Sequence, residues 1–113
     1  MMQNLEQKRA AHALEMCRRF KFETKNKSDV VKPMTTMVLD CGMLPSMAFA
    51  LDNSDRAHEE VFKAFIDYRG SKLSVKDYLE HLAKADAATL RTVTAEFMAY
   101  VRYLRRFANM KGA

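Results

Sequence analysis

Apolar side chains recur with helical spacing near the end of the chain, and this pattern constrains the fold more than any other. At about 100° per residue, they fall on one stripe of roughly 120°. A stripe of this width is typical of a helix that packs one face against a core. The sequence therefore predicts a long C-terminal helix that begins at Asp86 and ends near Asn109. The stripe contains Leu90, Val93, Phe97, Tyr100, Val101, Leu104, Phe107 and Ala108.

Shorter helical segments precede this helix, and turn or capping residues separate them. No sustained alternation of apolar and polar residues indicates strands, and good helix formers dominate the composition. The sequence therefore predicts an all-α fold: a compact bundle of five or six helices in one domain over residues 1–113. The first helix is expected from Asn4, which caps it with Gln7, to about Phe22, and the second from Ser28 or Asp29 to Gly42. A short third helix is expected to begin near Pro45. The fourth is expected from Ser54 or Asp55 to Gly70, and the fifth is capped by Ser74 with Asp77.

One proline and the two cysteines are harder to place. Pro33 falls inside the second segment, so that helix either begins close to Pro33 or bends there. Cys17 and Cys41 are far apart in the sequence and form no CxxC pair, which favours two small buried apolar residues.

Motifs for catalysis or cofactor binding are incomplete. The stretch HEEVF begins like a zinc-binding HExxH motif, but Phe62 stands where the second histidine is needed. The three histidines fall on three separate predicted helices, which favours uncommitted side chains. The three glycines are isolated, so neither a P-loop nor a dinucleotide-binding loop is possible. We therefore predict no catalytic residue, no cofactor and no metal site.

Basic side chains gather on the C-terminal helix, away from the apolar stripe. Arg91, Arg102, Arg105 and Arg106 share an arc of about 100° on which no acidic residue of this helix projects. Cations near the carboxyl end of a helix also offset its dipole, which explains Arg106, Lys111 and part of Arg105. The dipole does not explain Arg91, near the other end. The arc is therefore either a surface for an anionic partner or a solvated helix face.

A second basic segment lies at the end of the first predicted helix and in the loop that follows. Its basic residues, set against the single acid Glu23, are Arg18, Arg19, Lys21, Lys25 and Lys27. The helix dipole again explains part of this segment, and the net charge of +5 is compatible with an anionic partner without identifying one. We predict one continuous positive strip if the bundle brings the two segments together.

Three stretches of the sequence resemble a known family. They are LEQKRAAHALE near the start, CGMLPSMAFAL in the middle and LRTVTAEFMAYVRYLRRFA at the end. In this order, they are similar to the small-subunit family of type III-B, or Cmr-type, CRISPR effector complexes. Tyr103 stands where relatives often have tryptophan, and Leu90 where an aromatic residue is frequent. The most specific matches are Arg91, Thr94, Glu96 and the run from Tyr103 to Ala108.

The resemblance implies a non-catalytic, all-helical subunit that stacks in several copies. Separately, the short apolar runs and a start without a signal-peptide-like apolar core predict a cytoplasmic protein. Its implied partners are CRISPR RNA, target RNA, copies of itself and other type III-B effector subunits, with no membrane contact. Three other functions stay open: the small subunit of a type III-A complex, a helical protein-protein adaptor with a basic face, and an enzyme. The predicted RNA-binding residues are Arg91, Arg102, Arg105, Arg106, Lys111, Arg18, Lys21 and Lys25.

Overall fold

The described part of the chain folds into six α-helices, in agreement with the predicted fold class. The structure is a computed structural model that describes residues 4–19, 28–52 and 56–108. These residues contain no strand. The helices are α1 (Leu5–Arg19), α2 (Ser28–Cys41), α3 (Met43–Asp52), α4 (Arg56–Tyr68), α5 (Val75–Lys84) and α6 (Ala87–Ala108).

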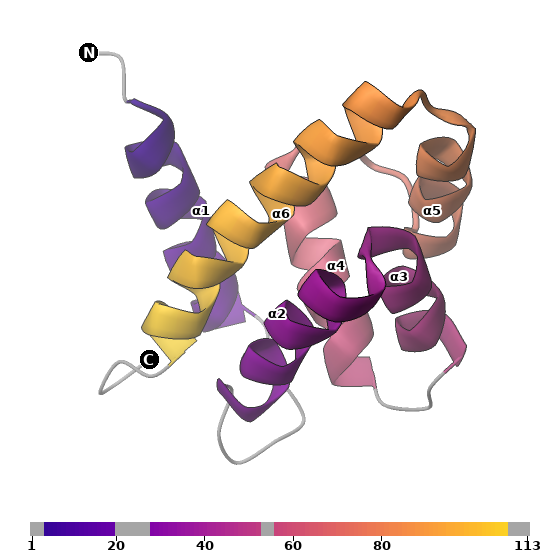
Figure 1. The fold of residues 1–113 in the computed structure, drawn as a ribbon. Coiled ribbons are helices and arrows are strands. Elements are labelled where there is room, and N and C mark those ends of the chain that lie inside the picture. Colours follow the sequence, from indigo (N-terminus) through magenta and orange to yellow (C-terminus); the bar gives the residue numbers. More distant parts are fainter. Residues whose placement is uncertain (1–3, 20–27, 53–55, 109–113) are drawn as a thin grey trace.

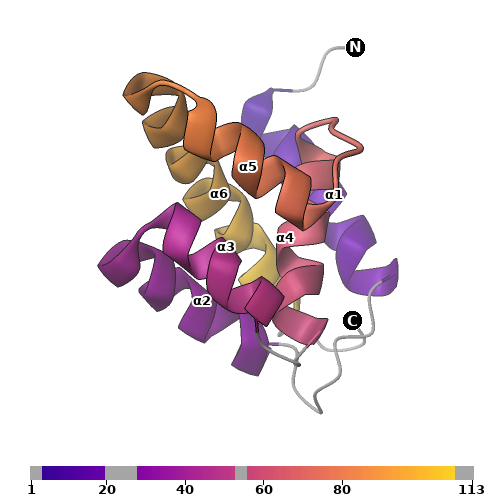
Figure 2. The same ribbon diagram turned by 90° about the vertical axis from the view of Figure 1, so that its right-hand side faces the viewer.

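The long helix α6 organises the bundle. It runs diagonally across the molecule and packs against α1, α2 and α4 (Figure 1). Helices α3 and α5 pack against each other and against α4, away from the carboxyl-terminal end of α6 (Figures 1 and 2). One face of α6 is therefore covered by three helices, while its other face lies at the surface.

The covered face of α6 is the apolar stripe expected from the sequence. Val93, Phe97, Tyr100, Val101 and Leu104 are buried in the core. Leu90, Phe107 and Ala108 are half-buried and pack against the edge of that core.

Aromatic rings fill the space between α4 and α6. Phe97 stacks on Phe62 with ring centroids 5.0 Å apart, and it meets Phe65 edge to face at 5.2 Å. Tyr100 stacks on Tyr68 at 4.8 Å. Such pairs each add about 0.5–1.5 kcal/mol beyond their apolar burial, so these rings hold α4 and α6 together.

Three helix starts are capped at the residues that the sequence predicts. Asn4 and Gln7 cap α1 reciprocally: Gln7 N donates to Asn4 Oδ1 at 2.8 Å, and Asn4 N donates to Gln7 Oε1 at 3.0 Å. Ser74 Oγ accepts from the amide of Asp77 at the start of α5. Asp86 Oδ1 accepts from Thr89 N at 2.7 Å at the start of α6. The expected caps of α4, Ser54 and Asp55, lie outside the described residues.

Two helices end at the predicted glycines. Gly42 follows α2 with a φ of 96°, and Gly70 closes α4 with a φ of 75°. At Gly70, the Ser71 amide donates to Ile66 O and the Gly70 amide donates to Asp67 O, which is a Schellman motif. A positive φ is unfavourable for residues with a Cβ atom, so glycine suits both positions.

Pro33 and the two cysteines now have places in the fold. Pro33 lies inside α2, five residues after its start at Ser28. Cys17 is buried as predicted, with Sγ 3.6 Å from Leu104 O, but Cys41 is exposed at the end of α2. The prediction that both cysteines are core residues is therefore wrong for Cys41, because it lies on the outer side of α2.

Candidate functional site

The basic arc predicted on α6 lies at the protein surface. Arg91, Arg102, Arg105 and Arg106 are all exposed. Within the described ranges 4–19, 28–52 and 56–108, none of these four guanidinium groups forms an ion pair. The four charges therefore face solvent, and no carboxylate of the described residues neutralises them by direct pairing.

The single acid of α6 points elsewhere. The carboxylate of Glu96 receives two hydrogen bonds from the guanidinium of Arg9 on α1, one of them from Nε at 3.3 Å. Both side chains are about four-fifths buried, and the hydrogen bond to Glu96 raises the pKa of Arg9. The Glu96 carboxylate therefore pairs with Arg9 at the contact between α1 and α6, and it does not pair with an arginine of the arc.

Helices α1 and α6 cross with their chain directions in the same general sense. Residues later in α1 contact residues later in α6, so the carboxyl-terminal ends of the two helices lie on the same side of the molecule (Figure 1). These contacts join Arg9 to Glu96, His12 to Tyr100, and Cys17 to Leu104.

At this end of the bundle, Arg18 of the second basic segment lies near the end of the arc. Arg18 follows Cys17, and Arg105 follows Leu104, the two residues in contact. Arg18 is exposed, and so is its neighbour Arg19, which lies 4.0 Å from Glu15. The structure therefore brings Arg18 and the end of the arc to one region. Lys21, Lys25 and Lys111 lie outside the described residues.

A polar network that the sequence did not indicate fixes α1 against α4 and α6. His12 Nδ1 lies 2.7 Å from Tyr100 Oη, and His12 Nε2 lies 2.7 Å from Asp67 Oδ2. This arrangement fits a ring that is protonated on Nε2, donates to Asp67 and accepts from Tyr100. The expectation of an uncommitted histidine is wrong for His12, because tertiary packing places both its ring nitrogens against partners.

The three histidines do not converge on one site. His58 on α4 packs its ring against Phe49, with centroids 5.8 Å apart, and His81 on α5 is exposed. Over the described ranges, no group of three His, Cys, Asp or Glu residues could hold a metal ion. None of the helices that the structure describes is both long enough and apolar enough to cross a membrane.

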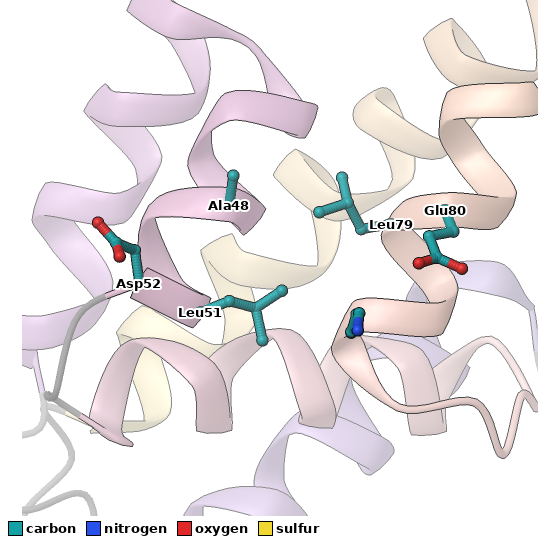
Figure 3. Close-up of a pocket in the computed structure, with 6 residues that line it drawn as sticks. Ala48, Leu51, Asp52, Leu79 and Glu80 are labelled. Carbon is teal, nitrogen blue, oxygen red and sulfur yellow. The ribbon is translucent and has the colours of Figure 1, made fainter.

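An apolar hollow lies between α3 and α5, away from the carboxyl-terminal ends of α1 and α6. Figure 3 shows the side chains that line it: Leu51 and Leu79 lie toward each other from the two helices. Asp52, Lys76 and Glu80 add two carboxylates and one ammonium group to its lining, and its volume is about 410 Å³. Such a surface suits the apolar side chain of a partner protein better than a polyanion.

A second hollow lies beside the arc, where α6 passes the junction of α2 and α3. Its volume is about 490 Å³, and almost all of its lining surface is apolar. The sequence could not indicate it, because residues separated by some fifty positions form its two walls. The lining residues are Gly42, Met43, Leu90, Arg91, Thr94 and Ala95.

Comparisons with known proteins agree with this architecture. The described helices resemble the X-ray structure of a CRISPR-associated Cmr5 family protein from Thermus thermophilus, with a TM-score of 0.80. The match covers 95% of this chain and 96% of that chain at 20% sequence identity, so it establishes the shared fold. A comparison with curated proteins gives no match.

A family model identifies the chain more directly. The model of the CRISPR-associated protein family Cas_Cmr5 matches residues 5–111, which includes every described helix. This match agrees with the resemblance to type III-B small subunits carried by the start, middle and end of the sequence. The chain therefore belongs to the Cas_Cmr5 family of CRISPR-associated proteins.

Proposed function

We propose that this protein is the non-catalytic structural and RNA-binding small subunit of a type III-B CRISPR effector complex. In this proposal, residues 1–113 act as one domain that stacks in several copies and contacts the phosphate backbone of guide and target RNA. Family membership supports a place among the subunits of a Cmr complex. The observation that carries the RNA-binding role is the exposed arc of Arg91, Arg102, Arg105 and Arg106, which forms no ion pair among the described residues.

The proposed chemistry is recognition of charge and shape. A guanidinium group carries a permanent positive charge and a planar set of donors that matches two phosphate oxygens. Contacts of this kind position a strand without reading its bases. The choice of sequence then belongs to base pairing between guide and target. The proposed contact residues are Arg91, Arg102, Arg105, Arg106, Lys111, Arg18, Lys21 and Lys25.

Several copies acting together explain how weak contacts become useful. One subunit that neutralises only a few phosphates binds weakly, and its affinity falls steeply with salt. Copies held side by side on one strand raise the effective concentration of each further contact. The proposed partners are therefore CRISPR RNA, target RNA, copies of this chain and the other type III-B effector subunits.

The hollow between α3 and α5 supports the subunit-contact part of the proposal. Leu51 and Leu79 offer an apolar surface on a side of the bundle that the arc does not occupy. A neighbouring subunit bound there would leave the arginines accessible to RNA. Protein contacts and RNA contacts would then use separate faces of the same small domain.

Charge reversal of the arc tests the proposal. We expect an assembled complex that carries Arg102→Glu, Arg105→Glu and Arg106→Glu to retain target RNA at least tenfold less well than wild type. The matched control reverses three exposed lysines that are not among the proposed contact residues: Lys8→Glu, Lys72→Glu and Lys84→Glu. The control makes the same change in net charge, so it should have a much smaller effect if position matters. Circular dichroism and complex assembly verify folding of both variants.

The same variants separate the proposal from an adaptor with a basic face. An adaptor whose arc meets an acidic protein would lose that partner in the arc variant, while the complex retained target RNA normally. Equal loss of RNA in the arc variant and the control would also contradict a localised interface. Co-purification with type III-A rather than type III-B subunits would assign the chain to the other small-subunit family. Substrate turnover by the isolated chain, abolished by one histidine substitution, would instead identify an enzyme.

A further inference from the structure

The hollow beside Arg91 opens on the same surface as the arc. Arg91 and Ala95 contribute to it from the exposed side of α6, and both side chains are exposed. Gly42 and Met43 form the opposite wall at the junction of α2 and α3. Any strand that follows the arginines of α6 toward Arg91 therefore passes the mouth of this hollow.

The arginines of the arc are not evenly spaced. Arg91 and Arg102 are eleven residues apart, which corresponds to about 16 Å along a helix. Between them, no charged side chain shares this side of α6: Ala95 is exposed, and Met98 and Ala99 are half-buried. Phosphates therefore find guanidinium partners at the two ends of this interval, while the middle offers uncharged surface to another part of the nucleotide.

The lining of the hollow suits a flat, weakly polar group. Its volume of about 490 Å³ falls within the roughly 300–1,000 Å³ typical of small-molecule sites. No carboxylate lines it, so a polyanion meets no repulsion from its walls. The hydroxyl of Thr94 donates to Leu90 O at 2.8 Å, which commits its proton to the backbone.

We infer that this hollow receives an unstacked nucleobase of the RNA strand that the arc holds by its phosphates. The inference rests on the proposed function and names a second kind of contact for the same surface. A base can lie on apolar side chains through its face, and an arginine at the rim can stack on that base or hold the adjacent phosphate. Every base has such a face, and the apolar walls offer few groups that read base edges. The contact therefore adds affinity without sequence preference.

A substitution that fills the hollow without changing charge tests the inference. Ala95→Leu adds apolar volume at the rim and keeps a good helix former in α6. Ala88→Leu is the matched control, because Ala88 is also an exposed alanine of α6 and does not line the hollow. The probes are a single-stranded oligoadenylate and an abasic ribose-phosphate strand of the same length, each titrated with the full-length chain at low salt.

We expect wild type to bind the base-bearing strand about tenfold more tightly than the abasic strand. Ala95→Leu should remove most of this difference by weakening binding of the oligoadenylate, while it leaves abasic binding unchanged. Ala88→Leu should behave as wild type. A strand with 2-aminopurine should show a fluorescence change with wild type that Ala95→Leu suppresses, which reports the base directly.

The outcomes distinguish the inference from the proposed function. The base site would be contradicted if wild type bound the oligoadenylate and the abasic strand with equal affinity. It would also be contradicted if Ala95→Leu weakened binding of both strands equally. An Ala95→Leu variant that binds RNA normally but fails to co-purify with effector subunits would contradict it as well, because the hollow would then be a protein contact. The proposed function is tested separately by the arc variant, which carries Arg102→Glu, Arg105→Glu and Arg106→Glu. If this variant loses binding to both strands, the proposed function is supported even when the base site is not. An arc variant that binds both strands as wild type does would instead contradict the proposed function itself.

Discussion

Arg9 on α1 holds the carboxylate of Glu96 on α6 through two hydrogen bonds, at a contact where both side chains are mostly buried. This pair has two consequences. It ties the first helix of the chain to the last, and it turns the only acid of α6 away from the exposed arginines. The positive surface of α6 therefore depends on where α1 packs.

A double-mutant cycle measures how much the interaction between Arg9 and Glu96 contributes to the free energy of unfolding. We expect Glu96→Ala and Arg9→Ala each to lower the free energy of unfolding by about 1–3 kcal/mol, because each leaves a mostly buried charge without its partner. The coupling between them should be about 1–2 kcal/mol, above the median of exposed ion pairs, since two hydrogen bonds fix the geometry. Urea denaturation of the four proteins checks this, and additive effects would contradict it.

The same pair makes a prediction about RNA. Glu96→Gln removes a negative charge from α6, which would strengthen phosphate binding if Glu96 acted on the arc. Because the carboxylate is held at α1, we expect RNA affinity within about twofold of wild type. Filter binding at two salt concentrations measures this, and a large gain in affinity would show that Glu96 weakens the arc in the native protein.

Tyr100 predicts how stability responds to alkaline pH. Burial raises the pKa of Tyr100 above its ordinary value near 10, and nearby negative groups act in the same direction. The folded state therefore keeps the phenol proton at a pH where the unfolded state loses it. The stabilisation is complete below about pH 10, and the free energy of unfolding falls as the pH rises beyond that, by up to about 1.4 kcal/mol per pH unit from this group.

Tyr100→Phe separates this effect from the titration of lysines. The variant lacks the phenol, so its stability should fall less steeply than that of wild type between pH 10 and 11. At neutral pH it should be less stable by about 1 kcal/mol, because His12 loses a hydrogen-bond partner. Denaturation curves at several pH values check both expectations. Parallel pH profiles of the two proteins would contradict the assigned role of Tyr100.

Gly70 offers a test of the backbone at the end of α4. Its φ of 75° is unfavourable for any residue with a Cβ atom, while an added Cβ would meet no atom within 4 Å. Gly70→Ala should therefore cost about 1–2 kcal/mol of stability from backbone strain alone. Thermal and urea denaturation measure this. Gly70→Asn should cost less, since asparagine tolerates this conformation better, and equal losses would point to a different cause.

The salt dependence of RNA binding counts the phosphate contacts. On single-stranded RNA, each neutralised phosphate contributes about −0.7 to the slope of log K against log salt. Arg102→Ala and Arg105→Ala should each make the slope shallower by about that amount while the order of preference among RNA sequences stays the same. A change in sequence preference would instead indicate base reading by these arginines.

Much of the fold follows from local patterns in the chain. Asn4 with Gln7, Ser74 and Asp86 mark helix starts because their side chains accept hydrogen bonds from amides that the first turn leaves unpaired. Gly42 and Gly70 mark helix ends because they adopt positive φ. These signals act within four residues, so tertiary structure is not needed to recognise them. The arc on α6 is similarly predictable, because helical periodicity fixes which of its side chains share a face.

The sequence by itself determined the helices, their apolar faces and the exposed arginines of α6, since each depends on residues a few positions apart. Only the tertiary structure decided that Arg9 forms an ion pair with Glu96 and that His12 contacts Tyr100 and Asp67. It placed Arg18 near the end of α6. It also decided that Met43 and Arg91 line one hollow. Each of these contacts joins residues about fifty or more positions apart, and their meeting depends on how whole helices cross, which no local pattern specifies.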